Sequence, residues 1–344
     1  MSHLAQQLCE QFSHLVEDSR NTDTRFNRID AANDYRSDSL IFVENQEKLF
    51  SDEAARPAVL VTTTDIAAQL ENEDLCVLTV QDVRMAQALI KQAYQDYDPS
   101  DPEWDAIHPS AVVHPSVTLG ENVRIGANSV IGQDTKIGNN VQIRANCVIE
   151  HTVEIGDDCI INNLVNIGYG CRLGKRVILR PGVIVGNEGF GFAQDKDRHY
   201  HRLPHTGIVE IHDDVQIGSN CNIDRATYGK TIIGSGVKVD ALCHIAHNVH
   251  IDEKSLFVAQ TGIAGSSYIG KRVICSGQTG ILDHRTVADD AVLLHRCGVT
   301  EDVPSAGMWA GTPVKPFREY VRGLTLGKRL DKLERKVKSL SGKD

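Results

Sequence analysis

The sequence places three histidines at intervals of three residues: His244, His247 and His250. An imidazole titrates close to neutral pH, so a histidine can serve as a general base. Three imidazoles can also bind a zinc ion that activates water for hydration of carbon dioxide. A surface histidine with neither role is the third interpretation. The choice depends on how the chain positions these side chains.

A six-residue repeat runs through the region that holds the histidines. Aliphatic residues occupy every sixth position, and glycine follows many of them. Neither the helical period of 3.6 nor the strand period of 2 selects this spacing over so long a run. The first run consists of Ile107, Val113, Leu119, Ile125, Ile131, Ile137, Ile143, Ile149, Ile155, Ile161, Ile167, Leu173, Leu179 and Val185.

The repeat predicts a parallel β-helix with three short strands per coil of 18 residues. Each aliphatic residue points into the prism, and the small residue after it is expected to allow the corner. Successive coils lie about 4.8 Å apart, so residues 18 positions apart stack. Gly265 is therefore predicted to lie directly above His247. The repeat is interrupted at residues 187–210, which we expect to protrude as a loop, and its phase shifts by four at residues 224–232.

Different patterns flank the repeat. Residues 1–100 mix helical and strand spacing, which predicts a small α/β domain, and the Pro-rich and acidic segment Asp98–Asp105 marks its end. Residues 101–303 are expected to form the β-helix domain. Residues 304–344 turn helical, with leucines at heptad spacing that need a partner surface, most economically other copies of the chain. The expected fold is mainly β.

The net charge of −10 argues against a general nucleic-acid binder. From Lys315 to Asp344, however, ten basic residues face four acidic ones, which fits either docking of an acidic partner or a solvated helix face. Nine cysteines without CxxC spacing are expected to be reduced and hydrophobic in character. We found no signal-peptide pattern and no apolar run of about 20 residues, so we expect a cytoplasmic protein without a membrane span.

Several motifs together resemble the UDP-3-O-acylglucosamine N-acyltransferases of lipid A biosynthesis. They are His244-Ile-Ala-His-Asn-Val249, Gly189-Phe-Gly-Phe192, Ile223-Asp-Arg225, Ala264-Gly-Ser266, Gly311-Thr-Pro313 and Leu333-Glu-Arg-Lys-Val337. The resemblance implies a left-handed β-helix, a homotrimer with active sites between subunits, and a UDP-sugar acceptor. It also implies that acyl carrier protein delivers the acyl chain on its phosphopantetheine, with no metal or other cofactor.

The same resemblance assigns roles to individual residues. His247 would be the general base, the Gly265 N–H would bind the oxyanion, and His284 would bind a phosphate or the pantetheine arm or support the proton transfer. Asp240 and His244 would contact the substrate, Phe42 would stack on uracil, and Asn45 would make a polar contact. Gly298 stands where related enzymes carry a bulky residue that measures acyl length, which predicts a longer acyl chain. The candidates for carrier-protein docking are Lys315, Arg318, Arg322, Lys328 and Arg329.

Other interpretations stay open at this point. Gly265 can be a simple corner glycine, His284 a surface residue, Asp240 a structural residue and Phe42 a core residue. The family's second uracil-binding aromatic falls at Lys48, which motivates a catalytically silent paralogue that binds lipid A precursors. A UDP-N-acetylglucosamine O-acyltransferase would lack the first hundred residues. A zinc carbonic anhydrase would leave those residues and the basic tail without a purpose.

Overall fold

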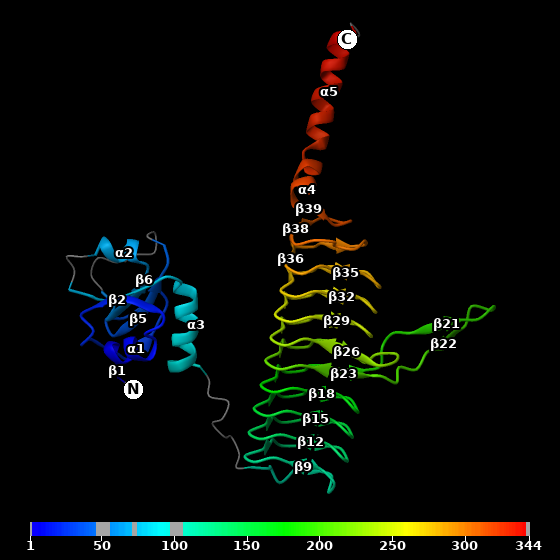
Figure 1. The fold of residues 1–344 in the computed structure, drawn as a ribbon, viewed down its shortest axis with the longest axis horizontal. Helices are drawn as coiled ribbons and strands as arrows, with labels where there is room; N and C mark the ends of the chain where they lie inside the picture. Colours follow the sequence, from blue (N-terminus) through cyan, green and yellow to red (C-terminus); the bar gives the residue numbers. More distant parts are fainter. Residues whose placement is uncertain (1, 46–55, 71–73, 97–105, 342–344) are drawn as a thin grey trace. The chain divides into compact units, whose positions relative to one another are not determined.

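The computed structural model describes residues 2–45, 56–70, 74–96 and 106–341 of the chain (Figure 1). Clustering of contacts divides the chain into two compact units, Met1–Asp98 and Pro99–Asp344. Each unit is considered by itself.

The first unit is a mixed β-sheet with helices on both faces. Its strands β5 (Ser39–Val43), β6 (Val59–Thr62) and β7 (Cys76–Val80) are buried almost throughout, which explains their nearly continuous apolar sequences. Helices α1 (Ala5–Gln11) and α3 (Val83–Tyr94) cover one face, and α2 (Thr64–Ala68) covers the other. The strand order is β2 (Val16–Arg20), β7 (Cys76–Val80), β6 (Val59–Thr62), β5 (Ser39–Val43), β4 (Arg28–Ile29), with only β2 antiparallel to its neighbour, and β1 (His3–Leu4) pairs separately with β3 (Arg25–Phe26).

The second unit is the predicted parallel β-helix. Its short strands form three faces, which we name by the number of strands they have in the described residues. The ten-stranded face consists of β8 (Val112–Val113), β11 (Val130–Ile131), β14 (Val148–Ile149), β17 (Asn166–Ile167), β20 (Ile184–Asn187), β25 (Asn222–Asp224), β28 (His244–Ile245), β31 (Gly262–Ile263), β34 (Gly280–Ile281) and β37 (Gly298–Val299).

The other two faces are likewise built from the short strands of successive coils. The eleven-stranded face consists of β10 (Arg124–Ile125), β13 (Gln142–Ile143), β16 (Ile160–Ile161), β19 (Ile178–Leu179), β24 (Gln216–Ile217), β27 (Lys238–Val239), β30 (Leu256–Phe257), β33 (Ile274–Cys275), β36 (Ala291–Leu293), β38 (Gly307–Ala310) and β39 (Lys315–Pro316). The nine-stranded face consists of β9 (Thr118–Leu119), β12 (Lys136–Ile137), β15 (Glu154–Ile155), β18 (Arg172–Leu173), β23 (Ile208–Ile211), β26 (Lys230–Ile233), β29 (His250–Ile251), β32 (Tyr268–Ile269) and β35 (Thr286–Val287).

The corners of the coils correct one detail of the sequence interpretation. The residue with left-handed backbone lies three positions after the inward aliphatic residue, as at Asn128 (φ 58°) and Asn140 (φ 56°). Asparagine and aspartate tolerate this conformation better than most side chains. The small residue directly after the aliphatic one serves another purpose. A Cβ on Gly138 would lie 2.9 Å from the backbone of Gly156 in the next coil, so glycine permits close stacking of coils rather than the turn itself.

The interior of the prism is built from aliphatic residues and cysteines. Ile149, Cys159 and Ile161 are completely buried there. The cysteines are all free, and burial raises the pKa of the Cys159 thiol to about 12. Since thiolates are the reactive form, Cys159 acts as a small hydrophobic residue, as predicted.

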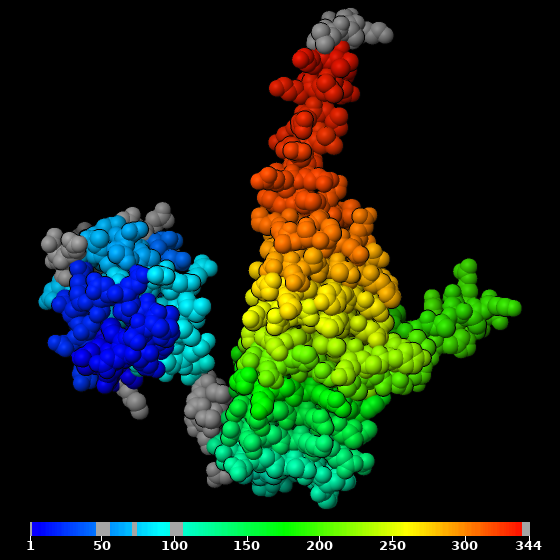
Figure 2. All heavy atoms as spheres, in the orientation of Figure 1, coloured from blue at the N-terminus to red at the C-terminus, as the bar shows by residue number. Residues whose placement is uncertain are grey.

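Both breaks in the repeat have a structural counterpart. Strands β21 (Phe192–Gln194) and β22 (Tyr200–Arg202) form an antiparallel hairpin that projects from the side of the β-helix (Figure 2). The four-residue phase shift appears as a longer coil, in which Asn222 pairs with His244, 22 residues further on. These two irregularities adjoin the same coils of the ten-stranded face.

The C-terminal segment begins with packed residues and continues as an exposed helix. Phe317 and Tyr320 of α4 (Phe317–Leu324) pack against the β-helix core. In α5 (Leu326–Ser341), Leu330, Leu333 and Val337 are exposed. Among the described helices, none combines the length and the apolar character needed to cross a bilayer.

Candidate active site

A groove of about 680 Å³ follows the upper coils of the ten-stranded face. His244 and His247 lie at its lower end, and Gly262, Gly280 and Gly298 succeed one another above them in register. A Cβ on Gly262 or Gly280 would meet no atom within 4 Å, so this part of the groove has a floor without side chains. The other lining residues are mostly apolar: Phe190, Ala246, Ile263, Ala264, Gly265, Ile281, Leu282, Asp283, Val299 and Thr300.

His247 occupies the corner after β28, and its imidazole lies against Gly265. A Cβ on Gly265 would come within 2.6 Å of His247 Cε1 and 2.8 Å of Nε2. The 18-residue coil predicted this neighbour. Among the hydrogen bonds of the described residues, none uses the Gly265 N–H as donor. The His247 imidazole and the Gly265 backbone therefore lie next to each other in the lining of the groove.

The other groove histidine, His244, is held by a buried polar cluster that sequence reasoning missed. Its Nε2 lies 3.5 Å from Asp224 Oδ2, and Asn222 Nδ2 lies 3.3 Å from its Nδ1. Asn222 also donates to Asp224 at 2.7 Å. Asp224 is 2% exposed, and this burial raises the pKa of its carboxyl group. Both nitrogens of His244 therefore face polar partners, whereas the hydrogen bonds of the described residues include a partner for Nδ1 of His247 but none for its Nε2.

A third imidazole, also missed from the sequence, belongs to His205 at the root of the hairpin. It is 3% exposed, and its ring centroid lies 4.9 Å from that of His247 at an interplanar angle of 63°. Its Nδ1 faces the carbonyl oxygen of Leu203 at 2.9 Å. A Cβ on Gly189 would lie 2.8 Å from His205 Nε2 and 2.9 Å from His247 Cβ. Glycine is thus required where the hairpin loop passes between the two histidines, and Phe190 then reaches the rim of the groove.

Two further predicted residues lie higher on the same side. His284 is exposed at the corner above Gly265, where its backbone N–H donates to the Gly265 oxygen at 3.0 Å. The neighbouring Asp283, and not His284, lines the groove. Gly298 does line it, but a Cβ at this position would lie 2.6 Å from Thr312 Cγ2. The space beside Gly298 is therefore partly filled by Thr312.

Asp240 lies apart from His247 within one chain. It precedes β28 and lines a second groove of about 510 Å³ on the eleven-stranded face, together with Arg180, Gln216 and Lys238. Its carboxylate accepts hydrogen bonds from the N–H groups of Ala241 (2.7 Å) and Ala259 (3.2 Å). The structure brings His244, His247, Gly265 and Gly298 into one groove and Asp240 into another.

The remaining predicted residues lie outside both grooves. In the first unit, Phe42 on β5 is half-buried and packs against the core, and Asn45 is exposed just after the strand. Lys48 lies outside the described residues. The basic residues predicted to dock a carrier protein are all exposed on β39, α4 and α5: Lys315, Arg318, Arg322, Lys328 and Arg329.

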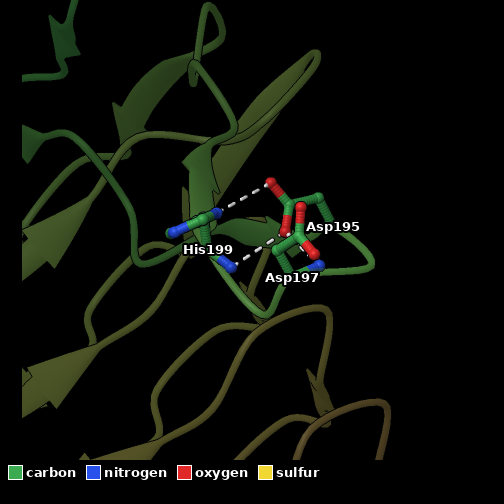
Figure 3. A group of neighbouring side chains, drawn as sticks. All are labelled: Asp195, Asp197 and His199. Carbon is green, nitrogen blue, oxygen red and sulfur yellow. Dashed lines mark hydrogen bonds and ion pairs between the residues drawn. The ribbon is translucent and has the colours of Figure 1, made fainter.

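The histidines do not assemble a zinc site within the chain. His250 lies on the nine-stranded face, with its Nε2 3.1 Å from Asp252. Over the described residues, the one cluster with metal-ligating spacing is Asp195, Asp197 and His199 at the hairpin tip (Figure 3). All three are exposed, and Asp195 accepts the backbone N–H groups of Asp197 and His199 at 2.9 Å. This arrangement is explained by the turn itself.

Comparisons with known proteins extend over different parts of the chain. The family described as GMPPB C-terminal domain matches residues 107–189, within the β-helix. A UDP-3-O-acylglucosamine N-acyltransferase of Methylococcus capsulatus (strain ATCC 33009 / NCIMB 11132 / Bath) is 46% identical over 327 residues, which cover 95% of this chain and 92% of that protein. Another of the same name, from Methylobacterium sp. (strain 4-46), is 41% identical over 49% of this chain and 48% of its own length.

Among solved structures, an Arabidopsis UDP-N-acetylglucosamine acyltransferase is similar, with a TM-score of 0.54 and 26% identity. The match covers 61% of this chain and 72% of that chain. The likeness confirms the predicted left-handed parallel β-helix. The match to the Methylococcus protein covers almost the whole chain, whereas the match to the Arabidopsis structure does not.

Proposed function

Because this chain belongs to the UDP-3-O-acylglucosamine N-acyltransferase family, we propose that it transfers a 3-hydroxyacyl chain to the 2-amine of UDP-3-O-(3-hydroxyacyl)glucosamine in lipid A biosynthesis. The acyl donor in this proposal is acyl carrier protein. The observation that carries the proposal is the groove that holds His247 Nε2 and the Gly265 backbone. Gly262, Gly280 and Gly298 continue this groove upward, and we call these three residues the glycine lane. The family relationship favours this function over the O-acyltransferase.

The geometry supports a mechanism with one base. His247 Nε2 takes the proton of the sugar amine as the nitrogen attacks the thioester carbonyl and the C–N bond forms. The oxyanion of the tetrahedral intermediate accepts a hydrogen bond from the Gly265 N–H. The intermediate then collapses, the C–S bond breaks, and the proton held by His247 passes to the departing phosphopantetheine sulfur. The products are the amide and the thiol of the carrier.

The upper groove suits an alkyl chain. From His244 the register rises through Gly262 and Gly280 to Gly298, which is three steps of about 4.8 Å or about 14 Å in all. With C–C bonds of about 1.5 Å, an extended chain of roughly a dozen carbons spans that distance. Exposed apolar side chains of the lining, Phe190 and Leu282, would shield it from water.

A homotrimer would complete the site. The ten-stranded and eleven-stranded faces both expose aliphatic side chains, including Val130 and Val148 on the first and Leu256 and Ile274 on the second. Packing one face against the other in a neighbouring subunit would cover these residues. The second groove, with Asp240 and two basic residues, would then lie opposite the first across the interface.

The donor and the nucleotide would use the two ends of the chain. Acyl carrier protein is acidic, so the exposed basic residues after Lys315 provide complementary charge. A carrier-bound donor also places the reaction in the cytoplasm. In the first unit, Phe42 and Asn45 remain the proposed contacts to the uracil ring, and the reaction as proposed needs no metal or other cofactor.

Purified protein, UDP-3-O-(3-hydroxyacyl)glucosamine and hydroxyacyl carrier protein provide the test. We expect amide product from the wild type and a loss of about 10²–10⁴-fold in His247→Ala. Equal turnover by the two proteins would contradict the base assignment. No turnover by either would favour the silent paralogue. An ester product from UDP-N-acetylglucosamine would identify the O-acyltransferase, and metal analysis of the protein tests the zinc alternative.

A further inference from the structure

Asn248, the residue after His247, has an amide group whose orientation is determined by its neighbours. The N–H of Thr227 donates to Asn248 Oδ1 at 2.9 Å, and Asn248 Nδ2 donates to the carbonyl oxygen of Tyr228 at 2.9 Å. Exchanging the amide oxygen and nitrogen would set donor against donor and acceptor against acceptor. The oxygen position is therefore decided by the local hydrogen bonds.

This oxygen lies beside the proposed base. Asn248 Oδ1 is 3.2 Å from His247 Nδ1. An amide oxygen accepts hydrogen bonds and cannot donate them, so the imidazole proton belongs on Nδ1. In a neutral imidazole the other nitrogen then carries the lone pair. That nitrogen, Nε2, is the ring nitrogen closer to Gly265: a Cβ on Gly265 would lie 2.8 Å from Nε2 and 3.1 Å from Nδ1.

We propose that Asn248 is a positioning residue that selects the Nδ1–H tautomer of His247 and so keeps Nε2 free to accept the substrate proton. The buried ring of His205 packs against the same imidazole and restricts its rotation. The backbone adds a second reason for asparagine, because Asn248 has a φ of 61°, a conformation that asparagine adopts more readily than most side chains. The catalytic part of this proposal rests on the proposed role of His247 as base; the tautomer itself does not.

The first experiment reads the tautomer directly. The protein is labelled with ¹⁵N in its histidine rings, and His247→Gln identifies the signals of residue 247. We expect the wild-type spectrum to show a protonated Nδ1 and an unprotonated Nε2 at pH above the titration of the ring. A protonated Nε2 in the wild type would overturn the proposal, whatever substrate the protein uses.

The second experiment uses Asn248→Asp, which preserves the tolerance for positive φ and the acceptor for Thr227. A carboxylate beside Nδ1 stabilises the imidazolium, so the acid limb of the kcat/KM profile should move up by about one pH unit, and activity below the midpoint should fall about tenfold. The other ionisable groups near the site are unchanged in this variant: Glu188, His205, Asp224, His244 and Asp283.

Two further variants separate positioning from folding. Asn248→Gly retains the backbone conformation and removes the amide, so we expect kcat to fall at least about tenfold while KM changes little. Asn146→Asp is the matched control, because Asn146 has the same left-handed corner conformation (φ 59°) in a lower coil. An unmoved pH profile in Asn248→Asp would refute the positioning role. Full activity of His247→Ala would instead refute the role of His247 as base, and no turnover by the wild type would refute the proposed function; in either case the spectrum would still decide the tautomer.

Discussion

Replacing Gly265 by alanine tests the site directly, because the structure gives the distance that the His247 imidazole would have to move. The new Cβ would lie 2.6 Å from His247 Cε1, whereas ordinary van der Waals contact begins at 3.4 Å. The ring must therefore shift by about 0.8 Å. A misplacement of about 1 Å can reduce a rate about 10²-fold, equivalent to about 2.7 kcal/mol in the activation barrier. The Gly265 N–H is unchanged by the substitution, so the loss isolates the position of the base.

The assay is single-turnover amide formation with the purified variant. Its control is Gly277→Ala. Gly277 occupies the equivalent position after β33, and a Cβ there would meet its nearest neighbour at 3.5 Å. We expect Gly277→Ala to retain wild-type rates and both variants to retain the wild-type Tm. Wild-type turnover by folded Gly265→Ala would refute the reasoning that the imidazole lies against this glycine.

Three further outcomes follow from the same structure. Thr312→Ala should extend the longest acyl chain accepted, because the Thr312 methyl fills the space beside Gly298; an unchanged chain-length profile over a panel of acyl donors would contradict this. Burial raises the pKa of Asp224, so its contribution to stability is present below the unfolded value of about 3.9 and is lost as pH rises through the folded value. Calorimetry should therefore show the Tm of Asp224→Asn rising relative to wild type from pH 4 to pH 7. Asp214→Asn is the control and should show no such rise, because the hydrogen bond from Arg176 lowers the pKa of the Asp214 carboxyl group. His205→Phe retains an aromatic ring against His247 and should retain measurable turnover, whereas His205→Ala should lower kcat more strongly; equal rates would show that the contact is dispensable.

The sequence was sufficient for the β-helix and for one contact of the site. A hexad repeat determines which residues point inward and which stack, so the adjacency of His247 and Gly265 followed from their separation of 18 residues. The hexad repeat did not reveal why a small residue follows many of the inward aliphatic residues. Only the structure shows that they allow coils to approach closely, while the corner itself is made by residues with left-handed backbone such as Asn140.

His205 and Asp224 were missed for a different physical reason. Each lies at a break in the repeat, where spacing no longer indicates neighbours. His205 reaches His247 because the hairpin leaves the β-helix and returns, and Asp224 precedes the longer 22-residue coil. The breaks were visible in the sequence, but nothing in it indicated which residues they would bring to the groove. Asp240 shows the converse. Although it is only seven residues from His247 in sequence, it directly follows β27 on the eleven-stranded face and lines a different groove.

The glycine lane beside His247 has a consequence for how specificity evolves. Its length is counted in coils, because each step from Gly262 to Gly280 to Gly298 adds one strand spacing. Inserting or deleting one 18-residue coil would change the lane by about 4.8 Å, roughly the length of four methylenes. A single side chain at the upper end adjusts the length by less than that. In such a scaffold, the number of coils therefore changes the preferred acyl length in large steps. The side chain at the upper end of the glycine lane changes it in smaller steps.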